Sequence, residues 1–113
     1  MARLRPDELA VQRLRELCLA LPEVTERPSH GEPAFFVRDK TLFVTLDDHH
    51  HGAAHLADDP DRYYRPPYVG HRGWLGVRID REPDWTEVAE LVRDAYRQVA
   101  PKVLRAQLDV TSA

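Results

Sequence analysis

Two short apolar runs separated by two polar residues place the strongest constraint on the fold of this chain. The runs Ala34–Arg38 and Thr41–Leu46 are rich in Phe, Val and Leu, and Asp39-Lys40 joins them. That is the pattern of a two-stranded antiparallel hairpin. Because side chains alternate along a strand, the second run is expected to divide between two faces, with Leu42, Val44 and Leu46 on one and Thr41, Phe43 and Thr45 on the other.

Amphipathic helices are predicted on both sides of this hairpin. Residues 6–21 start with Pro6 and two acids, which suit a first helical turn, and carry one apolar stripe. A second helix is predicted after Asp84-Trp85-Thr86-Glu87, a capping box in which Asp84 accepts from the third helical amide and Glu87 reaches back. Its expected buried residues are Val88, Leu91, Val92, Ala95 and Val99. Pro101 predicts a kink or break before Val103–Leu108.

The remaining segments set the fold class. Glu23–Pro33 contains prolines and Gly31 and is expected to be an irregular loop, whereas Gly52–Leu56 is a possible third strand. Asp59-Pro60 predicts the start of a short helix that runs to about Arg65. Trp74–Asp80 predicts a strand with Trp74, Gly76 and Arg78 on one face. The order α-β-β-(β)-α-β-(β)-α predicts an α+β fold of two layers, an antiparallel sheet packed against helices.

Length and composition narrow the class of protein. The 113 residues fit a single domain over 1–113, and the net charge of −3 lacks the basic excess usual in nucleic-acid binders. The one cysteine, Cys18, cannot form an internal disulfide and is interpreted as a small buried hydrophobe. There is no apolar run near the length of a membrane span, and Met1–Glu8 is charged. The expectation is a soluble cytoplasmic protein without a membrane partner.

A basic and aromatic segment is the candidate binding region. Between Arg62 and Arg81 the chain has five arginines and one acid, Asp80, while the flanking segments are acidic. This charge pattern is typical either of a local basic patch or of an ordinary mixed surface. Tyr68 and Trp74 are interpreted as core or turn anchors, or as rings that stack on a ligand while Arg72 and Arg78 supply charged contacts. Arg38 and Lys40, at the hairpin turn, could border the same sheet surface.

Motifs for catalysis and cofactors are lacking in the sequence. No nucleophile–base pair is recognisable, and neither glycine-rich phosphate-binding pattern occurs. His49, His50 and His51 are consecutive and His55 follows, so a metal site or a solvated polar turn are both open, although no second ligand cluster completes a coordination shell. The expectation is a protein that is not an enzyme and has no cofactor and no catalytic or metal residues.

Several motifs in order resemble the MmcQ/YjbR-like family. They extend from about Leu9 to Leu104 and comprise Leu19–Glu26, His30–Val37, Lys40, Arg72–Val77 and Ala95–Lys102. The resemblance implies a compact two-layer α+β domain similar to secretion-chaperone-like or CyaY-like folds. Family members are commonly labelled DNA-binding from a double-wing shape, and one branch is associated with resistance gene clusters for DNA-damaging antibiotics. The family has no established catalytic residues. Positions that match it are His30–Pro33, Lys40 and Arg72–Trp74.

Two functions remain open at this point. In the first, hairpins present Arg38, Lys40, Arg65, Arg72 and Arg78 to DNA phosphates. In the second, a pocket near Trp74 sequesters a small molecule, with Tyr68 and Phe35 or Phe36 in its lining and His30 and Arg72 fixing its orientation. The candidate site residues for DNA or ligand are Arg38, Lys40, Arg65, Arg72, Trp74, Arg78, His30 and Tyr68. The oligomeric state does not follow from the sequence.

Overall fold

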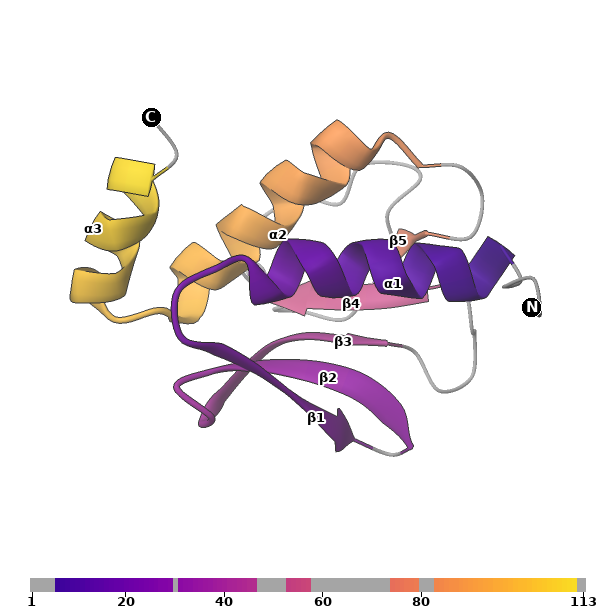
Figure 1. Cartoon of the computed structure of the whole chain (residues 1–113), viewed down its shortest axis with the longest axis horizontal. Helices are drawn as coiled ribbons and strands as arrows, with labels where there is room; N and C mark the ends of the chain where they lie inside the picture. The colour runs from indigo at the N-terminus through magenta and orange to yellow at the C-terminus, as the bar shows by residue number, and fades with distance from the viewer. Residues whose placement is uncertain (1–5, 30, 47–52, 58–73, 80–82, 112–113) are drawn as a thin grey trace.

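The computed structural model describes residues 6–29, 31–46, 53–57, 74–79 and 83–111. They form one antiparallel sheet in the order β1-β2-β3-β4-β5 and three helices (Figure 1). The strands are β1 (Val24–Ser29), β2 (Glu32–Val37), β3 (Thr41–Leu46), β4 (Ala53–Ala57) and β5 (Trp74–Arg78). The helices are α1 (Pro6–Leu19), α2 (Trp85–Val99) and α3 (Lys102–Thr111). The α+β expectation, with helices packed on an antiparallel sheet, is confirmed.

The first strand corrects the prediction of an irregular loop at Glu23–Pro33. Residues Val24–Ser29 pair antiparallel with β2 over their whole length, from Val24↔Val37 to Ser29↔Glu32. Pro28 lies opposite Pro33, and a proline is tolerated in β1 because this strand has a neighbour on one side only. The alternation of exposed Thr25 and Arg27 with half-buried Val24 and Glu26 is a strand period that the prolines obscured.

A bulge in β3 corrects the expected facing of Phe43. The β2–β3 register moves from Phe35↔Val44 to Phe36↔Leu42, which leaves Phe43 as an extra residue in β3. Because a bulge shifts the alternation by one residue, Phe43 and Val44 are both fully buried instead of pointing to opposite faces. The Phe43 ring meets the ring of Tyr96 edge-on, with centroids 5.8 Å apart.

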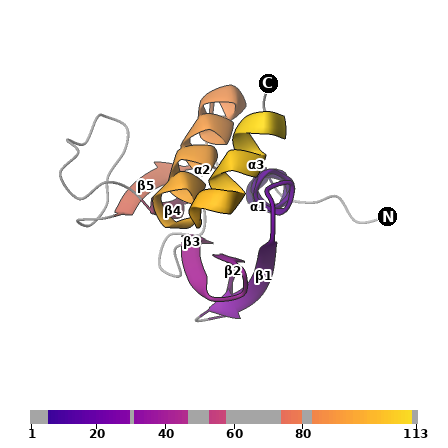
Figure 2. The same ribbon diagram turned by 90° about the vertical axis from the view of Figure 1, so that its left-hand side faces the viewer.

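The three helices lie on the same side of the sheet, as the two views show (Figures 1 and 2). α1 lies near β1, and Arg15 of α1 binds Glu26 of β1 through two hydrogen bonds of 2.7 and 3.1 Å. The hydrogen bond to Glu26 raises the pKa of the Arg15 guanidinium. α2 carries its buried residues Val88, Leu91, Val92, Ala95 and Tyr96 toward the sheet. One core of apolar side chains therefore fills the space between the layers.

Helix boundaries follow the predicted signals closely. Asp84 caps α2, because its Oδ1 accepts from the amides of Thr86 and Glu87 at 3.0 and 3.3 Å. The chain breaks at Ala100-Pro101, as predicted, and α3 follows with Leu104 and Leu108 buried. The expected short helix from Asp59 lies outside the described residues. No helix in the described part of the chain is long and apolar enough to cross a membrane.

Candidate binding face of the sheet

The side of the sheet away from the helices, here called the outer face, is the candidate binding surface. Strand pairing places Arg27, Ala34, Thr45, His55 and Gly76 in one row across all five strands. Alternation adds Thr25, Phe36, Leu42, Trp74 and Arg78 to the same face. The opposite row runs from Glu26 through Phe35, Val44 and Leu56 to Leu75 and belongs to the core side. Among the described residues, no helix lies over the outer face (Figure 2).

Arg27 and Phe36 form the best-defined contact on this face. The Arg27 guanidinium lies over the Phe36 ring with 4.2 Å between its central carbon and the ring centroid. Its Nε also lies 2.8 Å from Asp39 Oδ1, and Thr25 Oγ1 donates to the same carboxylate oxygen at 3.2 Å. Half of the Arg27 side chain stays exposed, at 49%. A cation stacked on a ring is thereby held in place at the solvent boundary.

The turn between β2 and β3 carries two of the predicted cations in an unusual backbone. Arg38 and Asp39 have φ values of 53° and 57°, and the Lys40 amide donates to the Val37 carbonyl at 3.1 Å. Both central residues of this β-turn have left-handed φ values, as in a type I′ turn, a conformation that favours Asn-Gly. Arg38 Nε lies 3.5 Å from Glu23 Oε2, an exposed and weak pair. Lys40 is exposed.

Trp74 and Arg78 lie on the outer face of β5, as their alternation predicted. Both are half-buried, while Leu75, Val77 and Ile79 are buried in the core. Trp74 pairs with Ala57 and lies at the end of the sheet that also holds the β2–β3 turn. Arg78 pairs with Ala53, about 13 Å farther along β5 by strand rise. Phe36 and Trp74 are three strands apart, a separation of about 14 Å.

The structure therefore places four of the eight candidate residues, Arg38, Lys40, Trp74 and Arg78, and leaves the others as predictions. His30, Arg65, Tyr68 and Arg72 lie outside the described residues, and so does the histidine run at 49–51. The pocket expected near Trp74 involves the same segment and also stays a prediction. Of its two alternative phenylalanines, Phe35 is fully buried in the core, and Phe36 is the one on the outer face.

Two groups with reactive side chains lie in the described part of the chain, Cys18 in the core and His55 on the outer face. Cys18 is fully buried in the core, which confirms its interpretation as a small hydrophobe, and burial raises the pKa of its thiol. His55 faces outward on β4, and among the described residues no three His, Cys, Asp or Glu side chains gather at metal-binding distance. The described part of the outer face offers two aromatic rings, guanidinium groups, hydroxyls and the His55 imidazole.

Sequence reasoning missed Arg27, an outer-face cation that lies over the ring of Phe36. It was assigned to a loop because Pro28, Gly31 and Pro33 follow it closely. The signal that identifies it is the alternation of Val24 and Glu26 with Thr25 and Arg27, which places Arg27 on the same face as its neighbours across β2. Pro28 is compatible with this assignment because β1 is an edge strand.

Fold and face together define a class: a small two-layer α+β domain with an antiparallel sheet backed by helices on one side. The YjbR family model matches residues 19–98, well over half of the chain. The chain belongs to the YjbR family, as the motif resemblance indicated. No curated protein and no solved structure matches it with significance.

Proposed function

We propose that this YjbR-family chain is a non-enzymatic nucleic-acid-binding protein that holds an extended single strand on the outer face of its sheet. The observation that carries the proposal is the Arg27 guanidinium stacked on the Phe36 ring at 4.2 Å, on the same face as Trp74 and Arg78. Aromatic rings on a sheet stack unpaired bases, and guanidinium groups contact phosphates.

The charge of the chain favours a single strand over a duplex as partner. Phosphate neutralisation supplies most of the affinity for duplex DNA, and a chain of net charge −3 provides little of it. Ring stacking requires base faces that a duplex conceals and a single strand exposes. Phe36 and Trp74, about 14 Å apart by strand spacing, would hold non-adjacent bases of one strand.

The backbone at the hairpin tip supports a binding role for Arg38. A residue with a β-carbon is strained in the left-handed region, and such strain concentrates at functional sites. Glycine or asparagine would relieve it, yet the tip has Arg38 and Asp39 at φ 53° and 57°. Retaining the cation at this tip is consistent with a contact to phosphate, beside the exposed Lys40.

The proposal is tested by equilibrium binding of dye-labelled oligonucleotides of about twelve nucleotides, single-stranded and duplex, followed by anisotropy. We expect the single strand to bind at least about tenfold more tightly, a difference of about 1.4 kcal/mol. Phe36→Ala should weaken binding by about 1–3 kcal/mol because it removes the ring on which the Arg27 guanidinium is stacked. Leu19→Ala is the matched control, since Leu19 is an exposed apolar residue at the end of α1.

An intrinsic reporter distinguishes stacking from mere charge attraction. Trp85 lies at the start of α2 with Arg13 over its ring, so Trp85→Phe leaves Trp74 as the single tryptophan. A bound base should quench Trp74 fluorescence in this variant. Failure of either oligonucleotide to bind at low salt, or tighter binding of the duplex than of the single strand, would overturn the proposal.

A further inference from the structure

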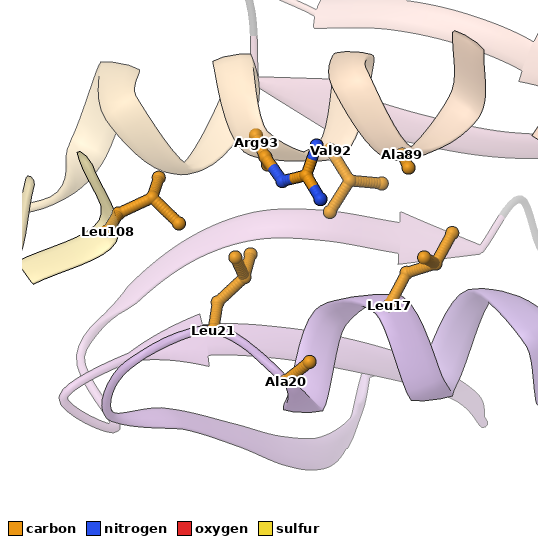
Figure 3. Close-up of a pocket in the computed structure, with 7 residues that line it drawn as sticks. All are labelled: Leu17, Ala20, Leu21, Ala89, Val92, Arg93 and Leu108. Atoms are coloured by element: carbon orange, nitrogen blue, oxygen red, sulfur yellow. The ribbon is translucent and has the colours of Figure 1, made fainter. Parts of the chain in front are cut away.

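A pocket of about 240 Å³ lies between the helices, on the opposite side of the sheet from the outer face (Figure 3). Leu17, Ala20 and Leu21 line it from α1 and the residues after it, and Leu108 lines it from α3. Ala89, Val92 and Arg93 line it from α2. Six of the seven lining residues are apolar, and the seventh is an arginine.

The pocket exists because two small residues stand where α1 and α2 approach each other. Ala20, just after α1, and Ala89 of α2 each carry only a methyl group, which leaves space between them. The surrounding walls are firm, since Leu21, Val92 and Leu108 are buried parts of the core. The space stays open because both positions have alanine, one on each side of the pocket. A larger side chain at either position would fill it.

Arg93 supplies one charge at the rim of this apolar pocket. Figure 3 shows its guanidinium between α2 and Leu21, over the space that the leucines enclose. One turn along α2, Arg97 binds Asp94 and Asp109 at 3.3 and 3.2 Å. Arg13 lies over the Trp85 ring. Within the described part of the chain, no carboxylate lies within 4.0 Å of Arg93, unlike Arg97.

We propose that this pocket binds a small aliphatic carboxylate, with the chain in the apolar space and the carboxylate on Arg93. A guanidinium matches the planar carboxylate through two parallel hydrogen bonds, and the leucine and valine side chains of the pocket offer apolar surface to a hydrocarbon tail. The volume of about 240 Å³ equals about eight water molecules at about 30 Å³ each, which suits a ligand of about eight to ten non-hydrogen atoms. Octanoate has this size and shape.

This site is independent of the nucleic-acid face, because the sheet separates the two. Its test is a titration of the isotope-labelled protein with sodium octanoate, followed by amide chemical shifts. We expect saturable shifts confined to the pocket residues, with a dissociation constant of about 0.1–5 mM for so small a ligand. 1-Octanol, which has the same chain without the charge, should bind at least about fivefold more weakly.

Two substitutions separate the charge from the apolar space. Arg93→Gln should weaken octanoate binding by about tenfold and leave octanol binding unchanged, while Arg93→Lys should fall between. Ala89→Leu should abolish binding of both by filling the pocket. Arg105→Gln is the matched control, because Arg105 is an exposed arginine of α3 that does not line the pocket.

Any one of the following outcomes would overturn the proposal. They are octanoate shifts that do not saturate or that spread beyond the pocket, equal binding of octanol and octanoate, and an Arg93→Gln protein that binds octanoate as the parent does. Arg93 is exposed, so its replacement keeps the fold and the result stays decisive even if Ala89→Leu fails to fold. Shifts confined to the outer face would likewise contradict it.

Discussion

Tyr96 shows how one side chain ties the layers together. Its ring is fully buried against Phe43, and its hydroxyl donates to the Pro22 carbonyl at 2.8 Å, across 74 residues of sequence. Tyr96→Phe removes this hydrogen bond and leaves the carbonyl without its donor. We expect a loss of about 1 kcal/mol in the free energy of unfolding, measured by urea denaturation. A loss below about 0.3 kcal/mol would show that water replaces the hydroxyl without cost.

The same residue predicts a decline of stability in alkali. Burial, with a further contribution from Glu23, raises the pKa of Tyr96 above its ordinary 10.0. Between the unfolded and folded pKa values the native state holds more protons than the unfolded state, so stability falls as pH rises. The raised pKa of Tyr96 therefore contributes fully to the free energy of unfolding below pH about 10. This contribution is lost as the pH rises through the pKa of Tyr96 in the folded protein. Urea unfolding of the parent and Tyr96→Phe proteins from pH about 8 to 11 should show a steeper decline in the parent.

Single elements show how far the sequence predicts this fold. The β2–β3 hairpin, the capped start of α2 and the break at Pro101 were predictable because each depends on local chemistry. The strand β1 was not, because Pro28 in this edge strand, with Gly31 and Pro33 after it, looks like a loop until a pairing partner is known. The bulge at Phe43 depends on tertiary packing. The extra residue in β3 lets Phe43 contact Tyr96 of α2 while Val44 stays in the core.

For the candidate site too, the sequence predicted what depends on local patterns and did not predict what depends on contacts between distant segments. Alternation along β5 correctly put Trp74 and Arg78 on one face, since alternation is local. Alternation within β1 gives the face on which Arg27 lies, but its contact with Phe36 depends on how β1 pairs with β2, which is long-range information. The contribution of His30, Arg65, Tyr68 and Arg72 remains a prediction.

At the β2–β3 turn, one residue is expected to affect both the stability of the fold and the binding of a single strand. Arg38→Asn replaces a strained left-handed arginine by a residue that tolerates this backbone, at the cost of a weak exposed pair with Glu23. We expect the free energy of unfolding to rise by about 0.5 kcal/mol, measured by urea denaturation, while single-strand binding weakens. Arg38→Lys is the control, because it keeps both the charge and the strain and should change stability little. Equal or lower stability of Arg38→Asn would mean that the turn carries no strain to relieve.

The chain as a whole has a net charge of −3. The salt dependence of its affinity for a nucleic acid measures how many of its cationic side chains contact phosphates. If Arg27, Arg38, Lys40 and Arg78 each contact one phosphate of a single strand, the log–log slope of affinity against salt is about −3. Replacing Lys40 and Arg78 together by alanine should reduce that slope by about 1.4, since each phosphate contact on a single strand contributes about 0.7. Anisotropy titrations between about 50 and 200 mM salt measure it.

A second double variant that removes the same charge from another part of the surface distinguishes direct contacts with phosphate from the effect of the protein's net charge. Lys102 and Arg105 are exposed cations of α3, on the helical side of the sheet. Their double replacement by alanine changes the net charge as much as the Lys40 and Arg78 pair does, but removes no contact to the outer face. If binding depends on contacts at that face, the slope of the α3 variant stays at the parent value. A similar fall in both double variants would mean that net charge alone attracts the strand and that the outer face is not where it lies.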